Sequence, residues 1–239
     1  MSRSFREILR STLNECDLVL SEEAITKLNI YNDMLIEYNR VMNLTALTEP
    51  REVALKHFCD SLMVLKYAEL PGNADLIDIG TGAGFPGLVL KIARPDLNVY
   101  LLDSLQKRLS FLEEVCCKAQ ISGVRFIHSR AEDGGRKEEL REKFDVAVSR
   151  AVAPLHTLCE YCLPYVKPGG VFLAMKGKEW EEEHSLAQNA TELLGGTVEK
   201  TDSFILSDAG QRAIIRIRKT SSTPDRYPRT GKKIKNKPL

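Results

Sequence analysis

The spacing of apolar residues divides this chain into a helical first part and a longer part in which strands and helices alternate. In the first part, apolar side chains recur every three or four residues, which is typical of amphipathic helices. Ser4 opens the sequence S-F-R-E, a capping box, and Ser21 is a preferred N-cap residue. A third helix is expected from Thr48 onward, and the sequence P-G-N ends the helical run at residues 71–73. We therefore predict a helical cap over residues 1–72.

Beyond this cap, short apolar runs alternate with helical periodicity, which is the pattern of parallel β-α-β units. Five of the runs predict strands, at residues 76–79, 98–103, 124–129, 144–149 and 171–176. Two later runs, TVEKTDSFIL and QRAIIRIRK, predict an antiparallel hairpin at one edge of the sheet. We therefore expect an α/β fold with a mostly parallel seven-stranded sheet in a domain over residues 73–219. Residues 220–239 have the composition of an unfolded, basic and flexible tail.

The stretch DLIDIGTGAGFPGLVLKIA, residues 75–93, combines an apolar strand, a glycine-rich turn and a helix. Glycine has no Cβ, so the backbone of the turn can adopt positive φ and approach a ligand closely. A turn of this kind, at the carboxyl end of a strand in a parallel sheet, binds the nucleoside part of a cofactor. The candidate cofactor-binding residues of this stretch are Asp78, Gly80, Gly82 and Gly84.

Two cofactor motifs overlap in this turn. Gly82, Gly84 and Gly87 fit G-x-G-x-x-G, the dinucleotide fingerprint, but this register begins late in the turn. The pattern D-x-G-x-G-x-G begins with Asp78 at the end of the strand, and it resembles motif I of class I methyltransferases, which bind S-adenosylmethionine. We favour the methyltransferase register. An NAD-dependent dehydrogenase is the rival enzyme, and a glycine turn without a ligand is the structural alternative.

Side chains at the ends of the next three strands are further candidates. Asp103 follows the glycine turn by about twenty residues, where a carboxylate can accept hydrogen bonds from ribose hydroxyls, although it would also serve as a helix N-cap. Ala131 and Glu132 follow the third strand, where backbone amides and a carboxylate can hold the edge of an adenine ring. Arg150 ends the fourth strand and suits a cofactor, a phosphate or a salt bridge to a neighbouring acid.

Composition indicates a globular protein. The 239 residues, 43% of them hydrophobic, suffice for one large domain with an appendage. No apolar run reaches the about 18 residues of a membrane span, and the N-terminus is too charged for a signal peptide, so we expect a cytoplasmic protein. Six cysteines at this low density fit a reducing compartment. Cys159 and Cys162 form a C-x-x-C without a second ligand pair, so we interpret them as packing residues rather than as a zinc or redox site, and we expect no metal.

The net charge of +1 conceals a strong asymmetry along the chain. Residues 211–239 contain ten Lys and Arg against the single acid Asp225, whereas residues 1–210 contain 24 basic and 32 acidic residues. A basic end can simply keep a protein soluble, but asymmetry of this size also indicates a polyanionic partner such as RNA.

Several motifs in their order along the chain carry a closer resemblance. The sequences NLT, KHFCDS, DIGTGAGFPG, LLDSLQKRLSFL, SRAED and SRAVAPL together resemble the RsmG family, also called glucose-inhibited division protein B. The resemblance covers essentially the whole chain, including the YPR of the basic tail. It implies a class I methyltransferase that transfers methyl from S-adenosylmethionine to N7 of one guanine in bacterial 16S rRNA, so the expected partner is 16S rRNA or the small ribosomal subunit.

The resemblance also implies roles for single residues. The implied cofactor contacts are Gly80, Phe85, Ala131, Glu132 and Arg150. The substrate-side candidates, which fall on the family's motifs, are Asn43, His57, Asp60, Ser61 and Lys176. For His57, packing within the helical cap is the alternative.

Absent motifs indicate the type of methyl transfer. Methylation of an exocyclic base nitrogen usually requires N/D-P-P-Y/F after the fourth strand, where this chain reads SRAVAP, and pyrimidine C5 methylation requires a cysteine that is not found at a strand end here. Guanine N7 carries an in-plane lone pair, so it can attack a sulfonium methyl directly, without a general base or a covalent adduct. A non-catalytic RNA-binding or ribosome-assembly factor that retains this fold is the alternative from another class, and we expect a monomer in either case.

Overall fold

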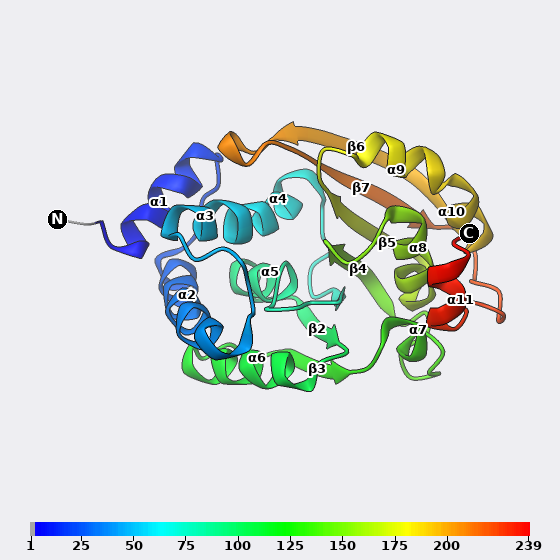
Figure 1. Ribbon diagram of the computed structural model, residues 1–239, viewed down its shortest axis with the longest axis horizontal. Helices are drawn as coiled ribbons and strands as arrows, with labels where there is room; N and C mark the ends of the chain where they lie inside the picture. Colours follow the sequence, from blue (N-terminus) through cyan, green and yellow to red (C-terminus); the bar gives the residue numbers. More distant parts are fainter. Residues whose placement is uncertain (1–2) are drawn as a thin grey trace.

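The computed structural model describes residues 3–239 (Figure 1). The α-helices are α1 (Phe5–Glu15), α2 (Glu22–Met42), α3 (Pro50–Val53), α4 (Asp60–Tyr67), α5 (Gly87–Ala93), α6 (Gln106–Lys118), α7 (Ala131–Gly134), α8 (Leu155–Cys162), α9 (Trp180–Leu186), α10 (Gln188–Leu193) and α11 (Gly231–Asn236). A π-helical segment, η1 (Ala54–Cys59), joins α3 to α4, and two short 3-10 helices are η2 (Leu163–Tyr165) and η3 (Ser207–Ala209). The strands are β1 (Asp75–Ile79), β2 (Asn98–Asp103), β3 (Val124–His128), β4 (Phe144–Arg150), β5 (Val166–Lys176), β6 (Gly196–Ile205) and β7 (Gln211–Lys219).

The strands form one sheet in the order β3-β2-β1-β4-β5-β7-β6. Strands β1 to β5 are parallel, and β7 pairs antiparallel with both β5 and β6. The predicted seven-stranded, mostly parallel sheet with an edge hairpin is therefore confirmed. Strand β5 begins at Val166, five positions before the predicted start, because the sequence KPGG continues the strand instead of forming a turn.

Two apolar layers cover the sheet, and alternate residues of each strand point into one or the other. In β1, Leu76 packs with the N-terminal helices, α5 and α6, whereas Ile77 and Ile79 pack with α8 and α10. Strand β5 repeats this division, with Leu173 on the first face and Phe172 on the second. Burial on both faces explains why these strands are nearly continuous apolar runs in the sequence.

The N-terminal helices, at the left of Figure 1, pack against α5 and α6 on one face of the sheet. The capping box of Ser4 and the N-cap of Ser21 are both present. The third helical run extends without a break from Pro50 to Tyr67 through the π-helical segment. Tyr31 of α2 is fully buried and donates its hydroxyl to the carbonyl of Ala83, so the cap is joined directly to the glycine loop.

The prediction of an unfolded tail at residues 220–239 is wrong. This segment folds back on the domain and ends in α11, the red helix that Figure 1 shows beside α7 and α8. Tyr227 and Ile234 are buried, and Arg229 forms an ion pair with the buried Glu160 of α8. Composition missed this structure because a few anchoring side chains, and not an apolar run, hold the segment in place.

Candidate active site

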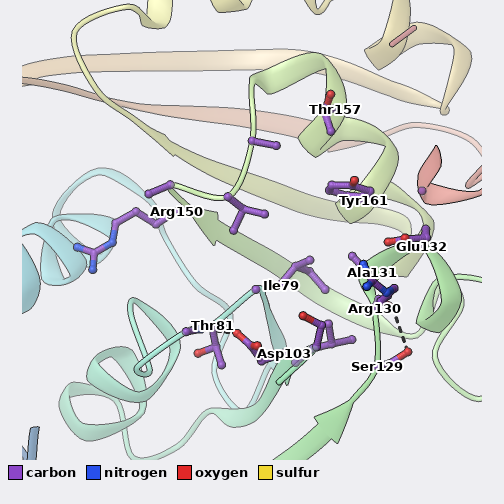
Figure 2. A pocket seen from close by; sticks show the side chains of 18 of the residues that line it. Ile79, Thr81, Asp103, Ser129, Arg130, Ala131, Glu132, Arg150, Thr157 and Tyr161 are labelled. Atoms are coloured by element: carbon purple, nitrogen blue, oxygen red, sulfur yellow. Dashed lines mark hydrogen bonds between the residues drawn. The ribbon is translucent and has the colours of Figure 1, made fainter. Parts of the chain in front are cut away.

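A cavity of about 1260 Å³ opens at the carboxyl ends of β1, β2, β3 and β4 (Figure 2). Its lining includes Gly80 and Gly82 of the glycine loop, Asp103 at the end of β2, Glu132 in α7 and Arg150 at the end of β4. The carboxyl edge of a parallel sheet is where such folds bind nucleotide-like cofactors. The four strand ends that the sequence singled out therefore meet in one cavity.

The glycine loop requires glycine at specific positions. Gly80 and Gly82 have φ of 74° and 59°, a region that other residues rarely adopt. A Cβ at Gly80 would lie 2.7 Å from Cγ2 of Val152, so the loop after β4 closes directly over the glycine loop. Gly84, with φ of 101°, is packed against Tyr31 and Leu112 and does not line the cavity.

Asp78 is buried beneath the glycine loop and does not line the cavity, so any part it has in cofactor binding acts through the loop that it supports. Its Oδ2 accepts hydrogen bonds from the hydroxyl of Thr81 at 2.7 Å and the amide of Gly87 at 2.8 Å. Burial raises the pKa of Asp78 to about 6, although these two hydrogen bonds act in the opposite direction. Asp78 therefore fixes the shape of the loop.

Asp103 lies at the cavity wall with its carboxylate 3% exposed. One oxygen accepts from the amide of Gly82 at 2.9 Å and the other accepts from the amide of Leu105 at 2.9 Å. Arg108 forms an ion pair with it at 3.3 Å. The carboxylate thus binds the amide of Leu105, the residue that precedes α6, and also lies in the cavity lining, where the contact to a ribose stays a prediction.

Ala131 and Glu132 form the opposite side of the cavity, with Tyr161 and Thr157 of α8 (Figure 2). The carbonyl of Ala131 accepts from the hydroxyl of Tyr165 at 2.7 Å, which fixes the first turn of α7. The side chain of Glu132 is buried beside Tyr161. A carboxylate in this position can accept a hydrogen bond from an exocyclic amine.

Arg150 joins the helical cap to the cavity. Its guanidinium donates to Asp60 at 2.6 Å and to the carbonyl of Lys56 at 2.9 Å. It also lies over the ring of Phe85, with 5.2 Å between Cζ and the ring centroid. Of the alternatives left open for Arg150, the salt bridge to an acid is present, and the side chain still lines the cavity.

The ring of His57 lies between Phe85 of the glycine loop and Thr45. Its ring stacks on Phe85 with centroids 4.4 Å apart, and Nε2 lies 2.7 Å from the hydroxyl of Thr45. Burial and the charge of Arg150 lower the pKa of His57 to about 3. The imidazole is therefore neutral at physiological pH and packs as a rigid part of the wall.

A second cavity of about 510 Å³ adjoins the first and shares His57 and Arg150 with it. Asp60 and Lys176 line it, together with Arg212 of β7. Asp60 accepts from both arginines, with Arg212 Nε at 3.1 Å, and Lys176 pairs with Glu183 at 2.5 Å. Charged groups of both signs thus surround a space next to the first cavity.

The other two substrate-side candidates do not reach either cavity. Ser61 is fully buried and donates to the carbonyl of His57 at 2.6 Å. Asn43 is the exposed C-cap of α2, with φ of 50°. Neither residue lines either of these two cavities, and their place on the substrate side stays a prediction. Both instead shape the cap, which in turn positions His57.

Sequence reasoning missed two groups of lining residues. Arg212 lies 152 positions from its partner Asp60, so no local motif connects them. The second group belongs to the segment that was expected to be unfolded, and its members are Gly231, Lys232, Lys235, Asn236 and Pro238. The excess of lysine in that segment was visible, but it indicated only a polyanionic partner.

Comparison with known proteins identifies the family. A model of the family described as GidB, rRNA small subunit methyltransferase G, matches residues 24–215. The chain belongs to the GidB family. Two proteins named ribosomal RNA small subunit methyltransferase G are similar to it along nearly their whole length. The one from Lachnoclostridium phytofermentans is 47% identical over 95% of this chain and 94% of its own, and the one from Alkaliphilus oremlandii is 45% identical over 98% of each.

A solved structure supports the fold assignment of this GidB family member. M. jannaschii TYW2 in complex with AdoMet is similar with a TM-score of 0.51 and 15% identity, over 62% of this chain and 70% of that one. At this identity the likeness concerns the fold alone, a class I methyltransferase fold. Among residues 3–239, no helix is both long enough and apolar enough to cross a membrane.

Proposed function

We propose that this protein transfers the methyl group of S-adenosylmethionine to N7 of a guanine in bacterial 16S rRNA. The chain belongs to the GidB family, and one structural observation carries the proposal. The cavity at the glycine loop adjoins a second cavity across a wall formed by His57 and Arg150. One cavity suits the cofactor and the other suits a base, so the methyl donor and its acceptor can meet at this wall.

The residues of the first cavity fit S-adenosylmethionine. Asp103 retains lone pairs that can accept from ribose hydroxyls, and Glu132 with the amides near Ala131 can hold the adenine. Gly80 and Gly82 let the backbone approach the amino-acid part of the ligand. When bound, the cofactor supplies an electrophilic methyl group on a sulfonium. His57 and Arg150, which line both cavities, would separate this cofactor from the base.

The site needs no general base for this reaction. Guanine N7 has a free lone pair in the ring plane, so the reaction requires alignment and not removal of a proton. His57 is the ionisable group at the wall that titrates nearest neutrality in solution, and its lowered pKa keeps it uncharged. Cys159 and Cys162 are fully buried in α8, so neither thiol is available as a nucleophile.

Charge supports an RNA partner. Arg212 and Lys176 line the second cavity, and Lys232, Lys233 and Lys235 are exposed on α11, which borders the first cavity. Arginine and lysine contacts to phosphate supply most of the affinity for nucleic acid. We propose that these groups hold 16S rRNA, within the small subunit or one of its precursors, and that the protein acts as a cytoplasmic monomer.

A product analysis tests the proposal. Small subunits from cells that lack the enzyme are incubated with the protein and cofactor, and the RNA is reduced and treated with aniline, which cleaves at N7-methylguanosine. One new cut in 16S rRNA is expected. Methyl incorporation at guanine N2, at adenine or at a cytosine carbon would contradict the proposed product.

Two rival functions have different signatures. A dehydrogenase would bind NAD and not S-adenosylmethionine, which calorimetry separates. A non-catalytic assembly factor would bind S-adenosylmethionine and the ribosomal particle without transferring methyl to it.

A further inference from the structure

The C-terminal segment, residues 220–239, lies outside the part of the chain that matches the family model, yet five of its residues line the cofactor cavity. We propose that this segment forms the wall at the adenosine end of the cofactor site, so that docking of the segment and binding of the cofactor stabilise each other. The inference rests on the proposed function, because it takes the cavity to be the S-adenosylmethionine site.

The segment is fastened to α8 by a buried charge pair. Glu160 is 1% exposed, and the side chain of Arg229 donates to both of its oxygens, at distances of 2.6 to 3.1 Å. The backbone amide of Arg229 also donates to Glu160, at 2.7 Å. An acid so deeply buried is stable only with a partner, so the fold of α8 depends on the docked segment.

Further contacts fix the path of the segment on both sides of Arg229. Arg141 donates to the carbonyls of Thr223 at 2.7 Å and Tyr227 at 2.9 Å. The ring of Tyr227 is buried, and Ile234 of α11 is fully buried. These anchors determine where α11 lies, because they precede it and occupy its inner face.

Gly231, the first residue of α11, meets the cavity at Glu132. A Cβ on Gly231 would overlap the carboxylate of Glu132, so a larger residue here would force the end of that side chain to shift, and the φ of Gly231 is not in the left-handed region. Figure 2 shows the red C-terminal ribbon beside Glu132 and Tyr161. The start of α11 therefore touches the side chain assigned to the adenine.

The wall offers groups that suit an adenine edge. Asn236 lines the cavity and carries an amide donor and an amide acceptor, and Lys232 and Lys235 carry ammonium donors. An adenine ring presents nitrogen acceptors and one exocyclic amine. A ligand that contacts both the glycine loop and α11 favours the docked segment, and by linkage the docked segment favours the ligand.

Truncation after Thr230 is the main test. It removes α11 but retains Arg229 and Tyr227, and folding is checked by circular dichroism and thermal unfolding. We expect S-adenosylmethionine to bind about tenfold more weakly by calorimetry, the effect of removing a net hydrogen bond and the enclosing wall. The double variant Lys233→Ala/Lys237→Ala, at positions that do not line the cavity, should bind the cofactor like the full chain. Equal affinity of the truncated and full-length proteins would overturn the inference.

A matched pair of substitutions tests the contact at Glu132 without removing the segment. Gly231→Ala places a methyl group against that carboxylate, whereas Gly72→Ala places one where nothing lies within 4 Å. The first should weaken cofactor binding severalfold and the second should leave it unchanged. Equal affinities of both variants and the unsubstituted chain would show that α11 does not position Glu132.

Limited trypsinolysis of the full chain gives an independent measurement. Cleavage at Lys232, Lys233 and Lys235 should be several times slower with saturating S-adenosylmethionine, and an unchanged rate would contradict the coupling. Failure of the proposed function has a different signature, because the full-length protein would then not bind S-adenosylmethionine. Weaker RNA binding by the truncated protein with unchanged cofactor affinity would assign α11 to RNA alone.

Discussion

Arg150 at the end of β4 donates to the carboxylate of Asp60 in α4, 2.6 Å away across 90 positions of the sequence. The same carboxylate accepts from Arg212 of β7, so one acid of the helical cap holds an arginine from each of two strands. The cap is thereby fixed to the edge of the sheet where both cavities open.

Asp60→Ala should destabilise the fold. The substitution leaves the largely buried guanidinium of Arg150 without its acid, so we expect a decrease of about 2 to 4 kcal/mol in the free energy of unfolding, measured in urea. Asp60→Asn keeps one acceptor oxygen and should destabilise the fold less. Asp208→Ala removes an exposed ion pair with Arg51 and should change stability by less than about 1 kcal/mol. Equal effects at positions 60 and 208 would contradict this role.

Asp103→Ala should weaken cofactor binding. The carboxylate faces the cavity and also orders the amide of Gly82, so the variant lacks both a ribose partner and a group that shapes the loop. We expect binding to weaken by about 1.5 to 3 kcal/mol, the range for a charged hydrogen-bonding partner. Calorimetry with S-adenosylmethionine measures it. Unchanged affinity in a folded variant would exclude the ribose assignment.

Asp78 should make stability depend on pH in an unusual direction. Its pKa is about 6 in the folded protein, raised from an ordinary value of 3.8, so the folded state binds the proton more tightly than the unfolded chain does. The stability from this group is present below about pH 4 and disappears as pH rises through 6, by on the order of 3 kcal/mol. Asp78→Asn removes the titration. Urea unfolding at several pH values should therefore show that the free energy of unfolding of the variant rises relative to that of the unsubstituted chain between pH 4 and 7. A difference between the two free energies that does not change with pH would refute the assignment.

The single-turnover rate of methyl transfer should vary little between about pH 6 and 9. An N7 lone pair needs no base, and His57, with its pKa lowered to about 3, does not titrate in this range. The measurement uses enzyme in saturating excess, so that changes in RNA affinity do not enter. An ascending limb with a midpoint near neutrality would reveal a general base and contradict direct displacement.

Lys233 of α11 and Lys237, which directly follows this helix, should contribute to RNA affinity by neutralising phosphates. Lys233→Ala/Lys237→Ala should make the slope of log K against log salt shallower by about 0.7 to 0.9 for each phosphate that is no longer neutralised. These substitutions are cleaner than truncation after Lys219, which would also leave Glu160 without Arg229. Lys27→Ala/Lys118→Ala, on α2 and α6, is the charge-matched control. The same slope in both double variants and the unsubstituted chain would mean that α11 does not bind phosphate.

Sequence periodicity predicted the sheet well because burial on both faces makes each parallel strand a distinct apolar run. The positions of the glycine loop and of Asp103 were predictable for a related reason, because each lies at the carboxyl end of an apolar strand and so at the same edge of the sheet. The motif gave the position of Asp78 but not the direction of its side chain, whose carboxylate accepts hydrogen bonds from Thr81 and Gly87 within the loop.

The tail could not be predicted because its fold depends on single side chains that meet distant partners. Arg229 and Glu160 are 69 positions apart, and neither carries a local signal for the other. Tyr227 and Ile234 stand alone among charged and polar residues, so no hydrophobic periodicity arises. A segment of this composition is ordered only by the surface on which it docks.

The position of β7 between β5 and β6 also determines when the sheet can be completed during synthesis. The ribosome makes β6 before β7, and within residues 3–239 β6 pairs with β7 alone, so β6 cannot join the sheet until residue 219 has left the exit tunnel. Domains generally fold in the order of synthesis. In this chain β1 to β5 can pair as they are made, but one edge of β5 stays unpaired until β7 has been synthesised. A nascent chain that stalls before residue 211 would present that edge of β5 to other unfinished chains, and strands with open edges pair readily with one another.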